Sequence, residues 1–199
     1  MFACRRSGDA EEASTELNAA GGHLGSVDVQ PSLKGELIEL RPLRPDDFDR
    51  LFAVARDPLI WEQHPATNRY QEEIFRAFFR EALESGGAFV VIDAANGQII
   101  GSTRFYGYDA DRSEIEIGWT FLARSYWGGR YNHEMKHLLL QHAFGFVDRV
   151  IFLVGPQNLR SRRAVEKIGG VERTARAVRN DRESVVYEIT RQRFEAIFQ

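Results

Sequence analysis

The sequence contains a single cysteine, Cys4, which excludes an intrachain disulfide and a metal cluster held by several cysteines. Because cysteine usage gives no sign of an oxidising compartment, we expect a cytoplasmic protein. Long hydrophobic runs are also lacking, since residues 88–92 and 150–154 are about five residues each and a membrane-spanning helix needs about 20. Residues 7–17 are polar and acidic and lack the apolar centre of an export signal. We therefore expect a soluble protein with no membrane partner.

An excess of charge of one sign is missing too. Lysine and arginine total 26, and aspartate and glutamate total 29, which gives a net charge of −3. The charges are interspersed, so no basic segment offers the concentrated positive surface that duplex nucleic acid requires. We expect no nucleic-acid partner.

What the sequence does contain is enough apolar material for one core, with 43% hydrophobic residues in 199. Residues 1–32 are rich in small and acidic residues with little apolar periodicity, and we predict a flexible extension there. Residues 33–199 are predicted to form one domain. The predicted strands are residues 36–41, 88–93, 98–106, 113–122, 150–154, 171–178 and 184–190, and the predicted helices are residues 44–55, 70–85, 131–146 and 159–168.

The order of these elements predicts the topology. Strand 113–122, helix 131–146 and strand 150–154 form a crossover, so the two strands should run parallel in one sheet. Asn96-Gly97 predicts a hairpin between strands 88–93 and 98–106, which lie on either side of it in the chain. The sequence thus predicts an α/β (mixed α+β) fold whose central sheet, mixed but mostly antiparallel, has about six to seven strands flanked by helices.

A glycine pair, Gly128-Gly129, lies between a predicted strand and the start of a predicted helix. The first turn of a helix has unpaired backbone N–H groups and a partial positive charge, and glycine lets an anion approach the backbone. This pattern is typical of a pyrophosphate site. The alternative is that the glycines only form a turn.

The residues around this turn resemble the acyl-CoA segment of the GNAT superfamily, in particular the branch that includes the ribosomal-protein N-terminal acetyltransferases. The resemblance covers about residues 33–189. The matching residues are Arg41-Pro42-Leu43, Glu116-Ile117-Gly118-Trp119, Trp127-Gly128, Tyr131, Asn158, Ser161, Lys167 and Gly169.

The resemblance implies transfer of an acetyl group from acetyl-CoA to a primary amine, on a small molecule or at a protein N-terminus, by a monomer or homodimer. The implied cofactor-binding residues are Trp119, Thr120, Phe121, Leu122, Arg124, Trp127, Gly128, Gly129, Arg130, Tyr131, Asn132, Asn158 and Ser161. Three positions depart from the family pattern: Arg130 replaces a glycine, Asn132 replaces a small residue, and Val165 stands where many members have tyrosine. These departures leave open a degenerate acyl-CoA-binding protein without turnover. Arg130 could contact phosphate or point to solvent.

An alkylammonium ion has a pKa near 10, so the reaction benefits from a base. Glu116 is the first candidate, because family members place a carboxylate in the corresponding strand. Glu114 has the same strand parity, and Glu183 precedes the last strand. The alternative for Glu114 and Glu116 is the alternation of any half-buried strand. A backbone N–H within residues 119–122 is the expected donor to the carbonyl oxygen.

Two residues near the predicted helix 159–168 have double interpretations. The family resemblance implies that Ser161 protonates the leaving thiolate, and the alternative is a polar contact near the helix start. Asn158 either contacts the pantetheine arm or a water, or caps the helix.

His133-Glu134-Met135-Lys136-His137 matches the H-E-x-x-H pattern of zinc hydrolases. The motif begins directly at the glycine turn, and the apolar positions of the helix leave both histidines on a flank. A zinc hydrolase is therefore a remote alternative, and we expect no metal. For the acceptor amine, the candidate contacts are Trp61, Glu62 and His64, with packing and capping as the alternative.

Overall fold

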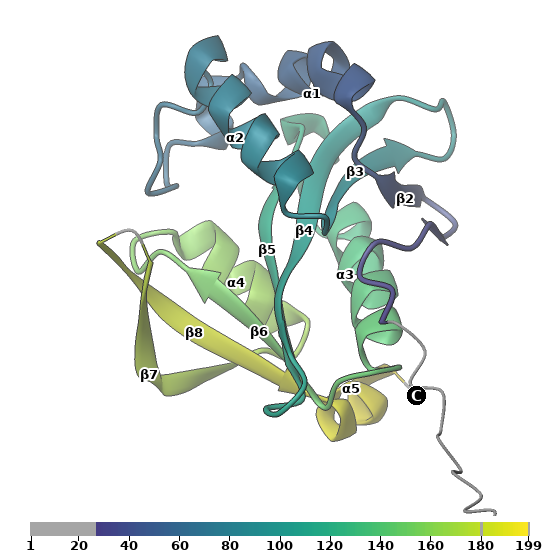
Figure 1. The fold of residues 1–199 in the computed structure, drawn as a ribbon, viewed down its shortest axis with the longest axis vertical. Helices are drawn as coiled ribbons and strands as arrows, with labels where there is room; N and C mark the ends of the chain where they lie inside the picture. Colours follow the sequence, from purple (N-terminus) through teal and green to yellow (C-terminus); the bar gives the residue numbers. More distant parts are fainter. Residues whose placement is uncertain (1–26, 180, 199) are drawn as a thin grey trace, which may run out of the picture.

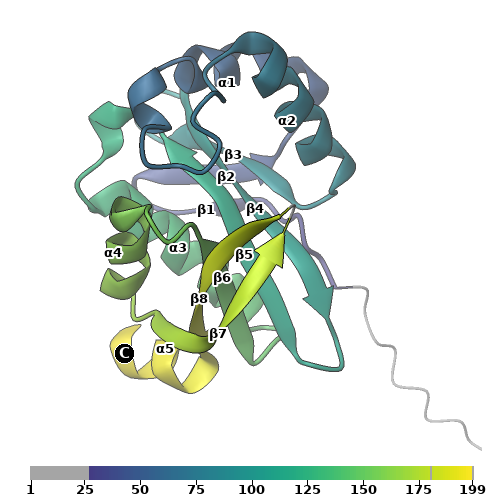
Figure 2. The ribbon, with the colours of Figure 1, turned by 90° about the vertical axis from the view of Figure 1, so that its left-hand side faces the viewer.

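The computed structural model describes residues 27–179 and 181–198. The helices are α1 (Phe48–Ala55), α2 (Glu72–Glu84), α3 (Arg130–Ala143), α4 (Leu159–Lys167) and α5 (Arg191–Phe198), with short 3-10 turns at Pro45–Asp47, Pro58–Ile60 and Arg124–Tyr126. The strands are β1 (Leu33–Lys34), β2 (Ile38–Pro42), β3 (Ala88–Asp93), β4 (Ile99–Asp109), β5 (Glu114–Leu122), β6 (Arg149–Val154), β7 (Val171–Arg179) and β8 (Arg182–Thr190). Helices α1 and α2 lie together at one end of the molecule and α5 at the other (Figures 1 and 2).

All strands join one eight-stranded sheet in the order β1-β2-β3-β4-β5-β6-β8-β7. Only β5 and β6 pair in parallel, as the crossover predicts, and the other pairs are antiparallel. The predicted mixed, mostly antiparallel α/β architecture is confirmed. The additional strand is β1, whose two residues pair with Leu40 and Glu39 of β2.

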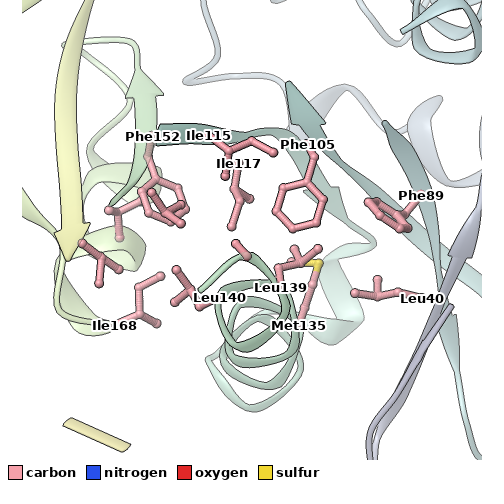
Figure 3. Packing of buried hydrophobic residues seen from close by; sticks show 14 of the residues in the cluster. Leu40, Phe89, Phe105, Ile115, Ile117, Met135, Leu139, Leu140, Phe152 and Ile168 are labelled. Carbon is pink, nitrogen blue, oxygen red and sulfur yellow. The ribbon is translucent and has the colours of Figure 1, made fainter. Parts of the chain in front are cut away.

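The central part of the sheet is buried on both faces, as β3 illustrates. Phe89 and Val91 belong to the cluster that includes α3, whereas Ala88 and Val90 belong to the cluster with α1 and α2. This alternation follows from the two-residue period of a strand. Figure 3 shows α3 packed under the sheet, with side chains such as Leu139 directed at the strands above. Each fully buried large apolar side chain stabilises the fold by roughly 1.5 to 3 kcal/mol.

The sheet opens between β5 and β6. Their parallel pairing covers only Glu114 to Glu116 on β5, although β5 continues to Leu122. On the other edge of β5, Ser102 pairs with Phe121 and Arg104 with Gly118, so two residues, Trp119 and Thr120, oppose one residue of β4. Such a bulge bends the strand that contains it, and β5 is no longer paired with β6 beyond Glu116. A cleft of about 1500 Å³ lies beside the opening.

Glu134, the glutamate of the H-E-x-x-H pattern, joins α3 to the start of β2. Its carboxylate accepts hydrogen bonds from the backbone N–H groups of Glu36, Leu37 and Ile38 at 2.8, 2.8 and 2.9 Å. A carboxylate held by three backbone donors in this way has a structural role, because it joins the helix to the strand. Within residues 27–179 and 181–198, no group of three or more His, Cys, Asp or Glu side chains is placed to hold a metal ion.

Most of the predicted N-terminal extension, residues 1–26, lies outside the described residues. Gln30, inside the predicted extension, donates its side-chain amide N–H to the carbonyl of Ala88 at 2.8 Å, so this part contacts the domain. The boundary at residue 32 stays a prediction. No helix in the described part of the chain combines the length and the apolar character that crossing a membrane requires.

Candidate active site

The N-terminus of α3 opens into the cleft. Gly129 is the N-cap of this 14-residue helix, and no side chain among the described residues caps it. Gly128 and Gly129 have φ angles of 106° and 122°, and a Cβ at either position would meet nothing within 4 Å. The unpaired first-turn N–H groups and the helix dipole therefore face open space, as an anion site requires.

Aromatic and basic side chains surround this helix end. Trp127 donates its indole N–H to the carbonyl of Leu122 at 3.0 Å, and the Arg160 guanidinium stacks 4.1 Å from the indole ring. Arg130 and Asn132, two of the positions that depart from the family pattern, both line the cleft. Tyr131 packs edge to face on Tyr126, and Arg124 pairs with Asp57 at 2.5 Å, so neither of these two lines the cleft.

The opposite wall includes the start of α4. Asn158 is 6% exposed and its Oδ1 accepts a hydrogen bond from the Ser161 backbone N–H at 3.2 Å. Asn158 is therefore a helix cap, the second of its two interpretations, and it also lines the cleft together with Ser161 and Val165. The Ser161 hydroxyl has no hydrogen bond to any described residue and remains available for a ligand.

Glu116 lies where β5 and β6 separate. Its side chain is 4% exposed and lines the cleft. Arg179 of β7 makes a two-point contact with it, at 2.6 Å to Oε2 and 3.2 Å to Oε1. Burial raises the pKa of the Glu116 carboxyl, while the Arg179 guanidinium acts in the opposite direction. Glu116 is thus a dry carboxylate with a fixed orientation.

The other two candidate bases lie elsewhere. Glu114 is 5% exposed but does not line the cleft; it lines a separate, smaller pocket, where it contacts Arg173 at 2.9 Å and Arg112 at 3.3 Å. Glu183 has 61% of its side chain exposed and lies 3.5 Å from Arg176. Of the three predicted carboxylates, only Glu116 lines the cleft.

The segment before α2 provides the acceptor candidates. Trp61 is buried, donates its indole N–H to the carbonyl of Ala55 at 2.7 Å, and packs against Phe121, so it combines packing with a place in the wall. His64 also lines the cleft, and burial lowers its pKa to about 3, so the ring is neutral at physiological pH. Glu62 holds Arg160 at 3.4 Å and does not line the cleft.

The sequence interpretation missed Lys136. This residue is on the buried face of α3, and its Nζ donates to the Thr120 hydroxyl at 2.7 Å. It lines the cleft under the bulge of β5, 5.6 Å from the centre of the Phe152 ring on β6. Burial lowers the pKa of Lys136 to about 7. The sequence carries one signal for it. Leu140 and Ala143 follow Lys136 by four and seven residues, a spacing that puts the lysine on the apolar face of the helix.

The chain resembles known acetyltransferases in its sequence and in its fold. A family model described as an acetyltransferase (GNAT) domain matches residues 38–171. Among solved structures, a GCN5-related N-acetyltransferase from Brucella melitensis has a TM-score of 0.72 at 22% identity, over 84% of this chain and 82% of that chain. An acetyltransferase from Agrobacterium tumefaciens has a TM-score of 0.65 at 26% identity, over 81% of this chain and 95% of that chain.

A Vibrio cholerae protein described as a ribosomal-protein-serine acetyltransferase has a TM-score of 0.68 at 13% identity, over 80% of this chain and 97% of that chain. At such identities the Brucella and Vibrio structures support the fold alone. No curated protein sequence matches this chain.

Proposed function

This chain belongs to the GNAT acetyltransferase family, and we propose that it transfers an acetyl group from acetyl-CoA to a primary amine in the cleft beside β5 and β6. The acceptor is a small molecule or a protein N-terminus. The observation that carries the proposal is the buried carboxylate of Glu116 at the point where these strands separate, in the same cleft as the open N-terminus of α3.

The residues of the cleft fit acetyl-CoA. The open glycines and first-turn N–H groups of α3 suit the pyrophosphate, with Arg130 at the same end. Residues 119–122, residues 127–130 and Asn132 would hold the cofactor on one side and Asn158 on the other. Acetyl-CoA supplies an activated thioester carbonyl.

The protein side of the reaction is mainly positioning. Glu116 accepts a proton from the amine, directly or through a water, and Arg179 keeps its carboxylate oriented. Backbone N–H groups of β5 beyond Glu116 no longer face β6 and donate to the carbonyl oxygen. Ser161 donates a proton to the leaving thiolate, because Val165, at the position of the family's tyrosine, has no proton to donate.

Two measurements test the proposal. Titration calorimetry should detect acetyl-CoA binding, and a thiol reagent should detect free CoA released only when an amine is present, with the N-acetyl product identified by mass spectrometry. A protein without affinity for acetyl-CoA would contradict the proposal. Binding without thiol release across a broad amine panel would instead identify a non-catalytic acyl-CoA-binding protein.

A further inference from the structure

The part of the cleft around Glu116 is rich in arginine. Six residues that line the cleft interact with one another directly or through Arg104, and we call them the acceptor end: Arg69, Glu81, Glu116, Trp119, Arg179 and Arg182. Arg179 is already paired with Glu116. Arg182 has no carboxylate partner among the described residues. Glu81 is thus the one carboxylate of the acceptor end that is left to balance the remaining guanidinium groups.

A further guanidinium lies behind this wall. Arg104 of β4 is 4% exposed, with its guanidinium carbon 4.6 Å from the Trp119 ring and 5.6 Å from the Phe78 ring. Its Nε and Nη2 atoms have no hydrogen-bond partner among the described residues. A buried charge without a partner is costly, so a positive charge held here needs a compensating anion nearby.

Arg69, which lines the cleft, is a second guanidinium without a carboxylate hydrogen-bond partner among the described residues. Its guanidinium carbon is 4.4 Å from the Phe78 ring and 5.4 Å from the Trp61 ring, and its polar contact is the His64 ring nitrogen at 3.3 Å. A neutral imidazole cannot compensate its charge. Burial, followed by repulsion from Arg104, lowers the pKa of Arg69 to about 10, so it is still a cation at neutral pH.

These charges restrict what can bind beside Glu116. An acceptor that is only an ammonium ion would enter a region where Arg69, Arg104 and Arg182 share one remaining carboxylate, Glu81, which interacts with both Arg69 and Arg104. A carboxylate on the same acceptor would provide the missing negative charge, and a guanidinium that has spare N–H donors binds carboxylate at two points.

We infer that the acceptor is an amine that carries a carboxylate close to the reacting nitrogen, with the carboxylate at Arg69 and the nitrogen at Glu116. Arg104 and Arg182 both repel the Arg69 guanidinium and so add positive potential around this carboxylate. The inference rests on the proposed acetyl transfer for the role of the nitrogen, and on the unpaired arginines for the carboxylate. A free α-amino acid and a peptide with an acidic N-terminal residue both have this chemistry.

The test compares acceptors that differ only in the carboxylate. Phenylalanine, phenylalaninamide and phenethylamine, and the corresponding sets for leucine and alanine, are assayed with acetyl-CoA for thiol release. Asp-Phe-amide and Asn-Phe-amide form the peptide arm. We expect a kcat/KM at least about tenfold higher for the carboxylate member of at least one arm, as for the gain of a charge-assisted contact. Equal or better turnover of the amides and amines would overturn the inference and leave the acetyl transfer intact.

A binding measurement separates the inference from catalysis. The N-acetyl forms of phenylalanine, phenylalaninamide, Asp-Phe-amide and Asn-Phe-amide are titrated in the presence of CoA, with tryptophan fluorescence as the readout. Tighter binding of a carboxylate form supports the inference even if no acceptor is turned over. The lack of turnover would then count against the proposed acetyl transfer and not against the inference. Equal affinity of the paired forms overturns the inference.

Variants locate the carboxylate. Arg69→Met should raise KM for the carboxylate acceptor about tenfold or more while leaving KM for acetyl-CoA unchanged. Arg69→Lys should recover part of the loss, because it restores the charge but not the two-point geometry. Arg80→Met, on the exposed side of α2 and outside the cleft, is the control and should behave as the wild type. An Arg69→Met protein with unchanged discrimination between phenylalanine and its amide would contradict this placement.

Discussion

Lys136 combines a buried position on α3 with a single hydrogen bond, to Thr120. Its pKa is about 7 in the folded protein, lowered by burial, and about 10.4 in an unfolded chain. Between these values the unfolded chain holds a proton that the folded chain lacks, so this residue makes stability rise as pH increases from about 7 to 10. Below pH 7 the folded protein bears the full cost of the buried ammonium ion.

We therefore predict that Lys136→Met stabilises the protein at pH 6, by roughly 1 to 3 kcal/mol, and that the difference shrinks toward pH 9 to 10. Urea unfolding of both proteins across this pH range measures it. Lys34→Met, at a side chain that is 74% exposed, should show no such pH-dependent difference. A difference in unfolding free energy between Lys136→Met and the wild type that does not depend on pH would contradict the titration of Lys136 in this range.

Arg179 influences the pKa of the Glu116 carboxyl. Its guanidinium opposes the rise in the Glu116 pKa that burial causes, so Arg179→Met should raise that pKa further. Because a base works only when deprotonated, the acidic limb of the kcat/KM profile should move to higher pH. Arg176→Met is the matched control, since Arg176 is on the same strand but pairs with Glu172 and Glu183. If the acidic limb of Arg179→Met stays at the wild-type pH, this limb does not report the ionisation of Glu116.

Among the structural elements, the glycine turn before α3 gives the clearest test. An alanine at Gly129 must adopt a φ of 122° and adds a methyl group where the phosphates would approach. We predict that Gly129→Ala raises KM for acetyl-CoA about tenfold, which corresponds to about 1.4 kcal/mol. Gly97→Ala is matched, because Gly97 also has a positive φ of 72° with open space around it, but it lies in the β3–β4 hairpin. The Gly97→Ala protein should be less stable than the wild type and should have an unchanged KM for acetyl-CoA.

The elements that periodicity describes well were predictable, and those that depend on neighbours were not. Strand 88–93 is predicted with the bounds of β3, since apolar runs between turn residues mark such strands. Two-residue β1 is too short to have a pattern. α5 follows β8 directly at Arg191, with no glycine or proline to signal the change.

The same distinction applies to the site. Glu116 and the glycine turn could be proposed from the sequence, because the family resemblance and the local strand–turn–helix pattern indicate them. The groups around Arg104 come from β4, β5, β7 and the segment before α2, so only the folded sheet brings them together. The bulge at Trp119 also has no local signal, since its φ of 51° falls on a tryptophan rather than a glycine.

The molecule as a whole should respond to acetyl-CoA, because the cleft joins residues of β5, α3, β6 and α4. A ligand that binds only the folded state at 100 times its Kd stabilises it by about 2.7 kcal/mol. For a chain of this size we expect the melting temperature to rise by roughly 5 to 10 °C. Thermal melts with acetyl-CoA measure the shift, and Gly129→Ala should need a higher concentration for the same rise. An unchanged melting temperature at saturating concentration would argue against binding in this cleft.

The most direct test of the account is the amine-dependent release of free CoA by Glu116→Gln at pH 7. The variant keeps the shape of the side chain but removes the base, so kcat should fall about 100-fold or more while the Kd for acetyl-CoA stays within about twofold of wild type. Glu183→Gln, at the exposed carboxylate on β8, should keep the wild-type rate. A Glu116→Gln protein that turns over acetyl-CoA at the wild-type rate would contradict the assignment of Glu116 as the base.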